Sequence, residues 1–138
     1  EYYKLPGEDR AHHSLGHRWE SDKDNGFAKY MRFQMGMIGR FLEQLDSPDY
    51  LDANGQSVLD NSVVLIGTEL SNPSQHSHED MMYMVAGGRG QFGTGRHHRL
   101  DPASGTAPND LYTSCLNALG IHTTTFGDRR FCTEPLSV

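Results

Sequence analysis

The chain has 138 residues, a net charge of −6 and 36% hydrophobic residues. This length suits one compact domain or a piece of a larger one. No run of 18 apolar residues occurs, which excludes a helical membrane span. The acidic balance argues against non-specific binding to nucleic acid, which needs a basic surface. Because the chain begins at Glu1 rather than at Met, we expect a processed or cut N-terminus.

The clearest predicted element is a helix over residues 27–46, which follows a polar, histidine-rich loop over residues 1–26. Apolar side chains recur in the helix at intervals of three or four, the spacing that places them on one face. Ser47-Pro48 then ends the helix. The apolar residues that define this face include Phe27, Met31, Ile38, Phe41 and Leu45.

Two core strands are expected within residues 62–87. The first, over residues 62–67, contains four consecutive apolar residues, which is typical of a strand buried on both faces in a parallel sheet. The second covers residues 81–86, and a glycine- and arginine-rich loop leads from it to a helix over residues 109–120 and an irregular tail over residues 121–138.

This order predicts an α/β fold: a layered, mostly parallel sheet with helices on both faces. Two or three strands are too few for such a sheet. We therefore expect residues 1–138 to be a single segment, the C-terminal part of a larger α/β domain. The missing strands would come from the remainder of its own polypeptide or from a partner subunit.

Histidines near the start of the chain are candidate metal ligands. His13 and His17 are four residues apart, so they share a face if this stretch is helical, and with His12 beside them they can hold one ion. The alternative is a polar surface loop with solvated histidines.

A second group of candidate ligands surrounds the predicted strands. Glu69 ends the first strand, where α/β sheets build their sites, and it is either a metal ligand or general base or a solvent-facing carboxylate. His76 and His78 precede the second strand, close to Glu79 and Asp80. Such a mixture of nitrogen and oxygen ligands suits divalent cations, although the stretch also fits a plain polar connection.

The loop over residues 87–99 is glycine-rich and basic. Its backbone N–H groups and the side chains of Arg89 or Arg96 can hold phosphate or sulfate, but it lacks the ending of a P-loop. A flexible surface loop is the simpler interpretation. The serines lack a Gly-x-Ser-x-Gly setting, so no nucleophile is indicated.

Several segments together resemble one known family. They are residues 13–18 (HSLGHR), 59–70 (LDNSVVLIGTEL), 94–97 (TGRH) and 116–120 (LNALG). In order and spacing they are similar to a secreted, functionally uncharacterised bacterial family named for its HXXSHH motif and related to the alkaline phosphatase and sulfatase superfamily. His13 and His17 fit the first and fifth motif positions, whereas Gly16 and Arg18 replace Ser and His.

The resemblance implies the C-terminal part of an alkaline-phosphatase-like, metal-dependent hydrolase acting on phosphate or sulfate esters. Its divalent metal, zinc in the first instance, would be bound by His13, His17, Glu69 and His76. Arg89 and Arg96 would hold the substrate, and upstream sequence would supply the nucleophile.

The departures from the motif, together with Leu70 in place of the superfamily's His, favour an alternative. In this alternative the chain is a catalytically degenerate relative that serves as a structural or binding subunit of a larger assembly. Either way the resemblance implies a periplasmic or extracellular location. Cys115 and Cys132 fit either one disulfide or two free thiols by number alone, and in an exported protein a disulfide between them would persist.

Overall fold

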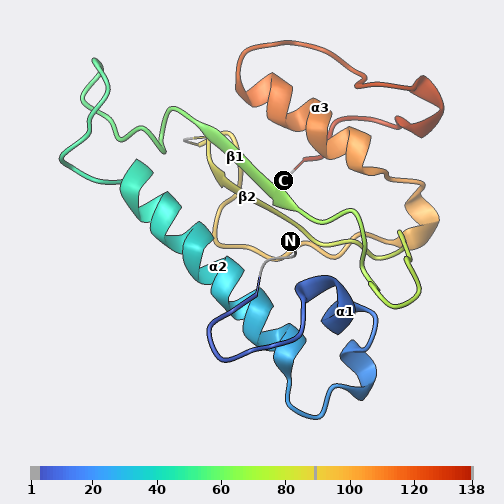
Figure 1. Ribbon diagram of the computed structural model, residues 1–138. Coiled ribbons are helices and arrows are strands. Elements are labelled where there is room, and N and C mark those ends of the chain that lie inside the picture. The colour runs from blue at the N-terminus through green and yellow to red at the C-terminus, as the bar shows by residue number, and fades with distance from the viewer. Residues whose placement is uncertain (1–3, 89, 138) are drawn as a thin grey trace. The chain divides into compact units, whose positions relative to one another are not determined.

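The computed structural model describes residues 4–88 and 90–137 (Figure 1). In chain order, its helices and strands are α1 (His12–Gly16), α2 (Gly26–Leu45), β1 (Val63–Gly67), β2 (Tyr83–Gly87) and α3 (Pro108–Ala118). The chain divides into two compact units. Unit 1 comprises the described residues up to Gln44 together with Gly67–Met82, and unit 2 comprises Leu45–Ile66 and the described residues from Tyr83 onward.

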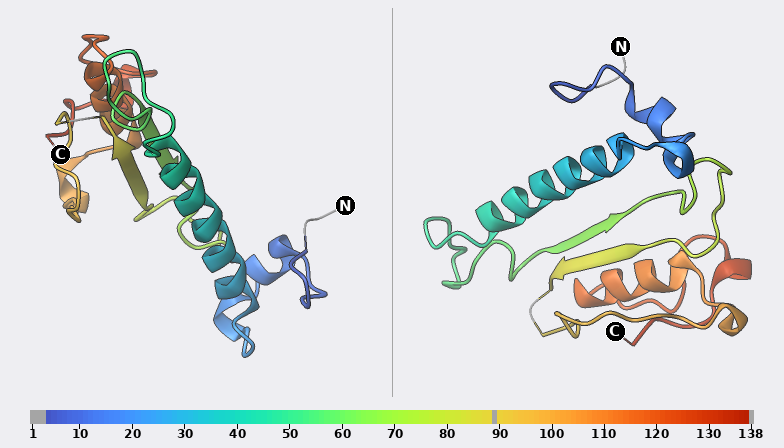
Figure 2. Two further views of the ribbon diagram at one scale, coloured as in Figure 1. Left: turned by 90° about the vertical axis from the view of Figure 1, so that its left-hand side faces the viewer. Right: turned by 90° about the horizontal axis from the view of Figure 1, so that it is seen from below.

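The expected layered and mostly parallel sheet is wrong. The described residues form one two-stranded sheet, β1 beside β2. The strands run antiparallel, because the Gly88 N–H at the end of β2 donates to the Ser62 carbonyl before β1 (2.6 Å), and Figure 2 shows the two arrows opposed. The described part of the chain thus has three α-helices and no parallel strand pair.

The apolar run of β1 is not a strand buried on both faces. Val63, Val64 and Ile66 are only half-buried, and Leu65 is exposed. A parallel pair needs a crossover, usually helical. Here the connection from β1 to β2 contains a tight turn, closed by a bridge between Asn72 and Ser77, and no helix. A connection of this kind favours antiparallel pairing.

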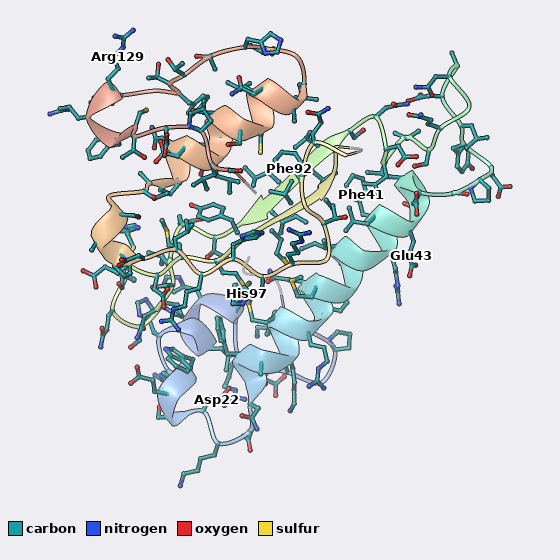
Figure 3. The ribbon with its side chains drawn as sticks, turned by 180° about the vertical axis from the view of Figure 1, so that it is seen from behind. Asp22, Phe41, Glu43, Phe92, His97 and Arg129 are labelled. Atoms are coloured by element: carbon teal, nitrogen blue, oxygen red, sulfur yellow. The ribbon has the colours of Figure 1, made fainter. Side chains whose placement is uncertain are left out.

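Unit 1 is organised around the first half of α2, the helix expected over residues 27–46. Tyr30 is completely buried, and its hydroxyl accepts the Leu5 N–H (2.8 Å) and donates to the Arg10 carbonyl (3.3 Å). Asp22 starts the helix by accepting the Phe27 N–H (3.0 Å), and this hydrogen bond lowers the pKa of its carboxyl group. Figure 3 shows Asp22 in the loop that leads into α2.

An ion-pair network fastens the polar N-terminal segment of unit 1. Arg10 binds Glu8 (2.7 Å) and Asp22 (2.9 Å). The side-chain hydrogen bond from Arg10 lowers the pKa of Glu8 to about 2. The segment over residues 1–26 was expected to be a loop. Its described part instead contains the helix α1 and a 3₁₀ turn at Trp19–Ser21.

Unit 2 is organised around α3 (Pro108–Ala118), which overlaps the helix expected over residues 109–120 and begins one residue earlier. Tyr112 on α3 meets Tyr83 of β2 edge to face, with ring centroids 6.2 Å apart. Burial, followed by the hydrogen bond with Tyr112, raises the pKa of Tyr83 to about 12. Leu111 and Cys115 complete the apolar side of the helix.

The disulfide expected between Cys115 and Cys132 is absent, since both are free thiols. Cys115 is buried in α3, and burial raises its pKa. Cys132 instead directs its thiol to the Phe126 carbonyl (3.2 Å). No helix in the described residues has both the length and the apolar character needed to cross a bilayer.

Candidate metal centre

The short helix α1 places His13 and His17 on one face, as their spacing predicts for a helical turn. The His17 N–H donates to the His13 carbonyl (3.2 Å), so the turn is closed across the pair. The Nε2 atoms of the two imidazoles are 3.2 Å apart, and both side chains are exposed. Two ring nitrogens at this distance share either a proton, with one as donor and the other as acceptor, or a cation.

A tight turn over residues 72–77 brings a third imidazole to this pair. Three hydrogen bonds hold the turn against the segment that follows α1: Trp19 Nε1–H to Asn72 Oδ1 (3.3 Å), Asn72 Nδ2–H to Glu20 Oε1 (3.3 Å), and Ser74 Oγ–H to the His17 carbonyl (3.1 Å). These bonds join sequence positions more than 50 residues apart. They make the third imidazole a neighbour of the first two.

That third imidazole is His76, whose ring centroid lies 4.9 Å from that of His17. Its backbone is in the left-handed region, with φ at +53°. A residue other than glycine adopts this conformation at a cost, and such strain is concentrated at functional sites. We call His13, His17 and His76 the imidazole cluster.

The imidazole cluster meets part of the requirement for zinc. With Zn–N bonds of 2.0–2.1 Å and tetrahedral angles, two ligand nitrogens lie about 3.3 Å apart, close to the 3.2 Å between His13 and His17. Among the described residues, however, no group of three or more His, Cys, Asp or Glu side chains is arranged to hold a metal ion. Two ligand positions are formed, and His76 is adjacent but not in place as a third.

Glu69 does not join the imidazole cluster through its carboxylate. Its backbone carbonyl instead lies 2.7 Å from Nδ1 of His78, and because a carbonyl can only accept, Nδ1 is the donor. A histidine oriented in this way by a carbonyl is typical of metal ligands. Two residues apart, His76 and His78 would lie on the same side of an extended segment, but the backbone of His76 has a positive φ and the two rings have different partners.

The other candidate residues within the described ranges, His12 and Arg96, have surroundings of their own. His12 packs its ring on Phe27, with centroids 5.5 Å apart, and its buried Nε2 has no hydrogen-bond partner among the described residues. Arg96 is exposed in unit 2, without a hydrogen bond or ion pair to another described side chain. Arg89 lies outside the described residues.

Comparisons with known proteins find no match for this chain. No family model matches the chain, and no curated protein or solved structure is significantly similar to it. None of these comparisons therefore assigns the chain a family or an activity.

Proposed function

We propose that this chain supplies imidazole ligands for a divalent metal, zinc in the first instance, in a hydrolase that acts on phosphate or sulfate esters. The observation that carries the proposal is the 3.2 Å separation of the His13 and His17 Nε2 atoms beside the His76 ring. The resemblance to the HXXSHH family and its superfamily supports the reaction class. A bound metal polarises an ester oxygen or activates a nucleophile.

In this proposal the histidines of the imidazole cluster bind the metal ion, and the turn over residues 72–77 positions one of them. His13 and His17 bind the ion through Nε2, and a rotation of the exposed His76 ring brings its nitrogen in as a third ligand. The hydrogen bonds of Asn72 and Ser74 position the turn that carries His76. The reacting nucleophile comes from upstream sequence, as the resemblance to the superfamily implies.

Cobalt titration of the chain tests the metal site, because Co²⁺ replaces zinc and its visible absorption reports tetrahedral nitrogen ligands. We expect one ion per chain. We expect His17→Ala to weaken binding by roughly tenfold or more, since His17 contacts both other imidazoles. His97→Ala, which removes an exposed histidine of unit 2, is the matched control and should bind as the parent chain does. Binding unaffected by His17→Ala would reject the site.

A second function, that of a non-catalytic structural or binding subunit, is favoured by the sheet. Within the described residues each strand pairs on one side only, and a two-stranded sheet is marginal by itself. The free edges accept further strands, from the remainder of the polypeptide or from a partner subunit. An ester-hydrolysis assay on protein that includes the upstream sequence separates the two functions: loss of turnover in His13→Ala and His76→Ala supports the hydrolase, and unchanged turnover excludes it.

A further inference from the structure

Unit 2 contains an open pocket of about 770 Å³. It lies among the segment after β2, the C-terminal half of α3, the loop that follows α3, and the tail. Its volume is in the range of pockets that bind small organic ligands. None of its lining residues belongs to the imidazole cluster.

The charge of the lining differs from that of the whole chain. The chain has 18 acidic residues and a net charge of −6, yet the twelve lining residues include no Asp or Glu and do include Arg129 and His122. Most of the other lining side chains carry amide or hydroxyl groups. A pocket with many donors and no carboxylate favours a ligand that is rich in acceptors and negatively charged.

Asn117 presents a donor whose orientation is fixed. Its Oδ1 accepts the Thr123 N–H (2.9 Å), so its Nδ2 is the group left to donate. Thr123 also donates its hydroxyl to the Thr125 carbonyl (2.9 Å), which stiffens the loop. In the described part of the chain, the hydroxyl groups of Thr124 and Thr125 make no hydrogen bond to another residue.

The neighbouring side chains of Arg129 and Arg130 differ in whether they form an ion pair with a described residue. Arg130 is paired with Asp128 (2.6 Å), whereas the Arg129 guanidinium has no ion pair with any described residue. Arg129 is one of the residues that line the pocket, and Figure 3 shows its side chain extending outward from the protein. A cation exposed in this way attracts an anion and contacts it without being desolvated.

The pocket also has an apolar wall. The ring of Phe92 lies against Gly88, where an added Cβ would come within 2.8 Å of Phe92 Cδ2. Gly88 also has φ at +63°. Both this left-handed conformation and the closeness of the Phe92 ring disfavour any residue other than glycine at position 88. An aromatic ring among hydroxyl and amide donors suits a sugar, which has apolar faces and polar edges.

We propose that this pocket binds a small ester of sulfate or phosphate, with a body about the size of a monosaccharide. The oxyanion meets Asn117 Nδ2, the threonine hydroxyls and Arg129, and the body rests on Phe92. The inference is independent of the metal site in unit 1.

Amide NMR spectra of the ¹⁵N-labelled chain in EDTA test the proposal with four probes: glucose 6-phosphate, glucose 6-sulfate, inorganic phosphate and glucose. We expect saturable shifts at Asn117 and residues 123–125 with at least one ester, weaker binding of phosphate, and no shift with glucose. The ester that binds tighter identifies the oxyanion. No shift at these residues with either ester overturns the proposal, and because EDTA is present this failure leaves the metal proposal intact.

Variants separate the pocket from general charge attraction. Asn117→Asp keeps the acceptor for the Thr123 N–H but replaces the donor with a negative charge, so ester binding should weaken by roughly tenfold or more. Arg129→Gln should weaken it less, and Arg130→Gln, whose arginine is already paired, should leave it unchanged. Equal binding by Asn117→Asp and the parent chain overturns the proposal. If Asn117→Asp does not fold, ester binding by Arg129→Gln is compared with binding by Arg130→Gln. Equal binding by these two variants overturns the proposal.

Discussion

Each unit of this chain depends on one aspartate at the start of a helix, but the two aspartates are satisfied differently. Asp22 of unit 1 accepts the Phe27 N–H and is ion-paired with Arg10. Asp110 of unit 2 accepts the N–H groups of Ala107 and Thr133 and the Thr133 hydroxyl, with no cation from the described residues. The N-terminal attachment of unit 1 is therefore electrostatic, whereas the C-terminal attachment of unit 2 depends on hydrogen-bond geometry.

The largest effect is expected from breaking the unit 2 attachment. Asp110 is 1% exposed. Burial raises its pKa, but the hydrogen bonds from Ala107 and Thr133 outweigh burial and keep that pKa below its ordinary value. In Asp110→Asn an amide NH₂ group replaces one of the two accepting oxygens and faces the N–H and hydroxyl donors that this oxygen accepted. We therefore expect the free energy of unfolding to fall by about 2–3 kcal/mol. Urea unfolding, with hydrogen exchange of the α3 amides, measures it.

The control for this substitution is another aspartate of unit 2. Asp101 is exposed and caps the 3₁₀ turn at Pro102–Ser104 by accepting the Ala103 N–H (2.9 Å). Asp101→Asn keeps a good capping residue, so its cost should be below about 0.5 kcal/mol. Equal losses for the two variants would contradict a special role for the buried carboxylate.

The contrast between the units also shows what the sequence reveals and what it hides. The apolar periodicity of residues 27–45 and the Asn-Asp start at Asn109 are local signals, and α2 and α3 lie where they indicate. The pairing of the strands is not local: four apolar residues before Gly67 fit a parallel or an antiparallel strand equally well. The connection between the strands, a turn closed at Asn72 and Ser77, decides the matter.

The same division applies to the candidate sites. The spacing of His13 and His17 is enough to place their rings together once the turn is helical. The approach of His76 depends on its positive φ and on hydrogen bonds to residues far away in sequence, which no local pattern encodes. The pocket in unit 2 was missed because three consecutive threonines at 123–125 resemble an irregular tail, although their hydroxyls and the absence of nearby acids were visible signals.

A smaller and pH-dependent effect is expected in unit 1. Glu8 has its pKa lowered from 4.5 to about 2 by the hydrogen bond from Arg10. A carboxyl group whose pKa is lower in the folded state stabilises folding above its unfolded pKa, and this contribution disappears as the pH falls through the folded value. Glu8→Gln should therefore be less stable than the parent chain at pH 7, and the difference should shrink below pH 4.5 and vanish near pH 2.

Trp19 is the only tryptophan in the sequence and belongs to unit 1, so its fluorescence follows this unit during urea unfolding at each pH. Asp24→Asn is the control. Asp24 is exposed, and its carboxylate comes no nearer than 3.9 Å to the Arg10 guanidinium. Exposed ion pairs of this kind contribute little to stability. A Glu8→Gln difference that stays constant from pH 7 to pH 2 would show that the side chain acts through packing instead of charge. The attachment of unit 1 would then not be electrostatic, and its contrast with the hydrogen-bonded attachment at Asp110 would be lost.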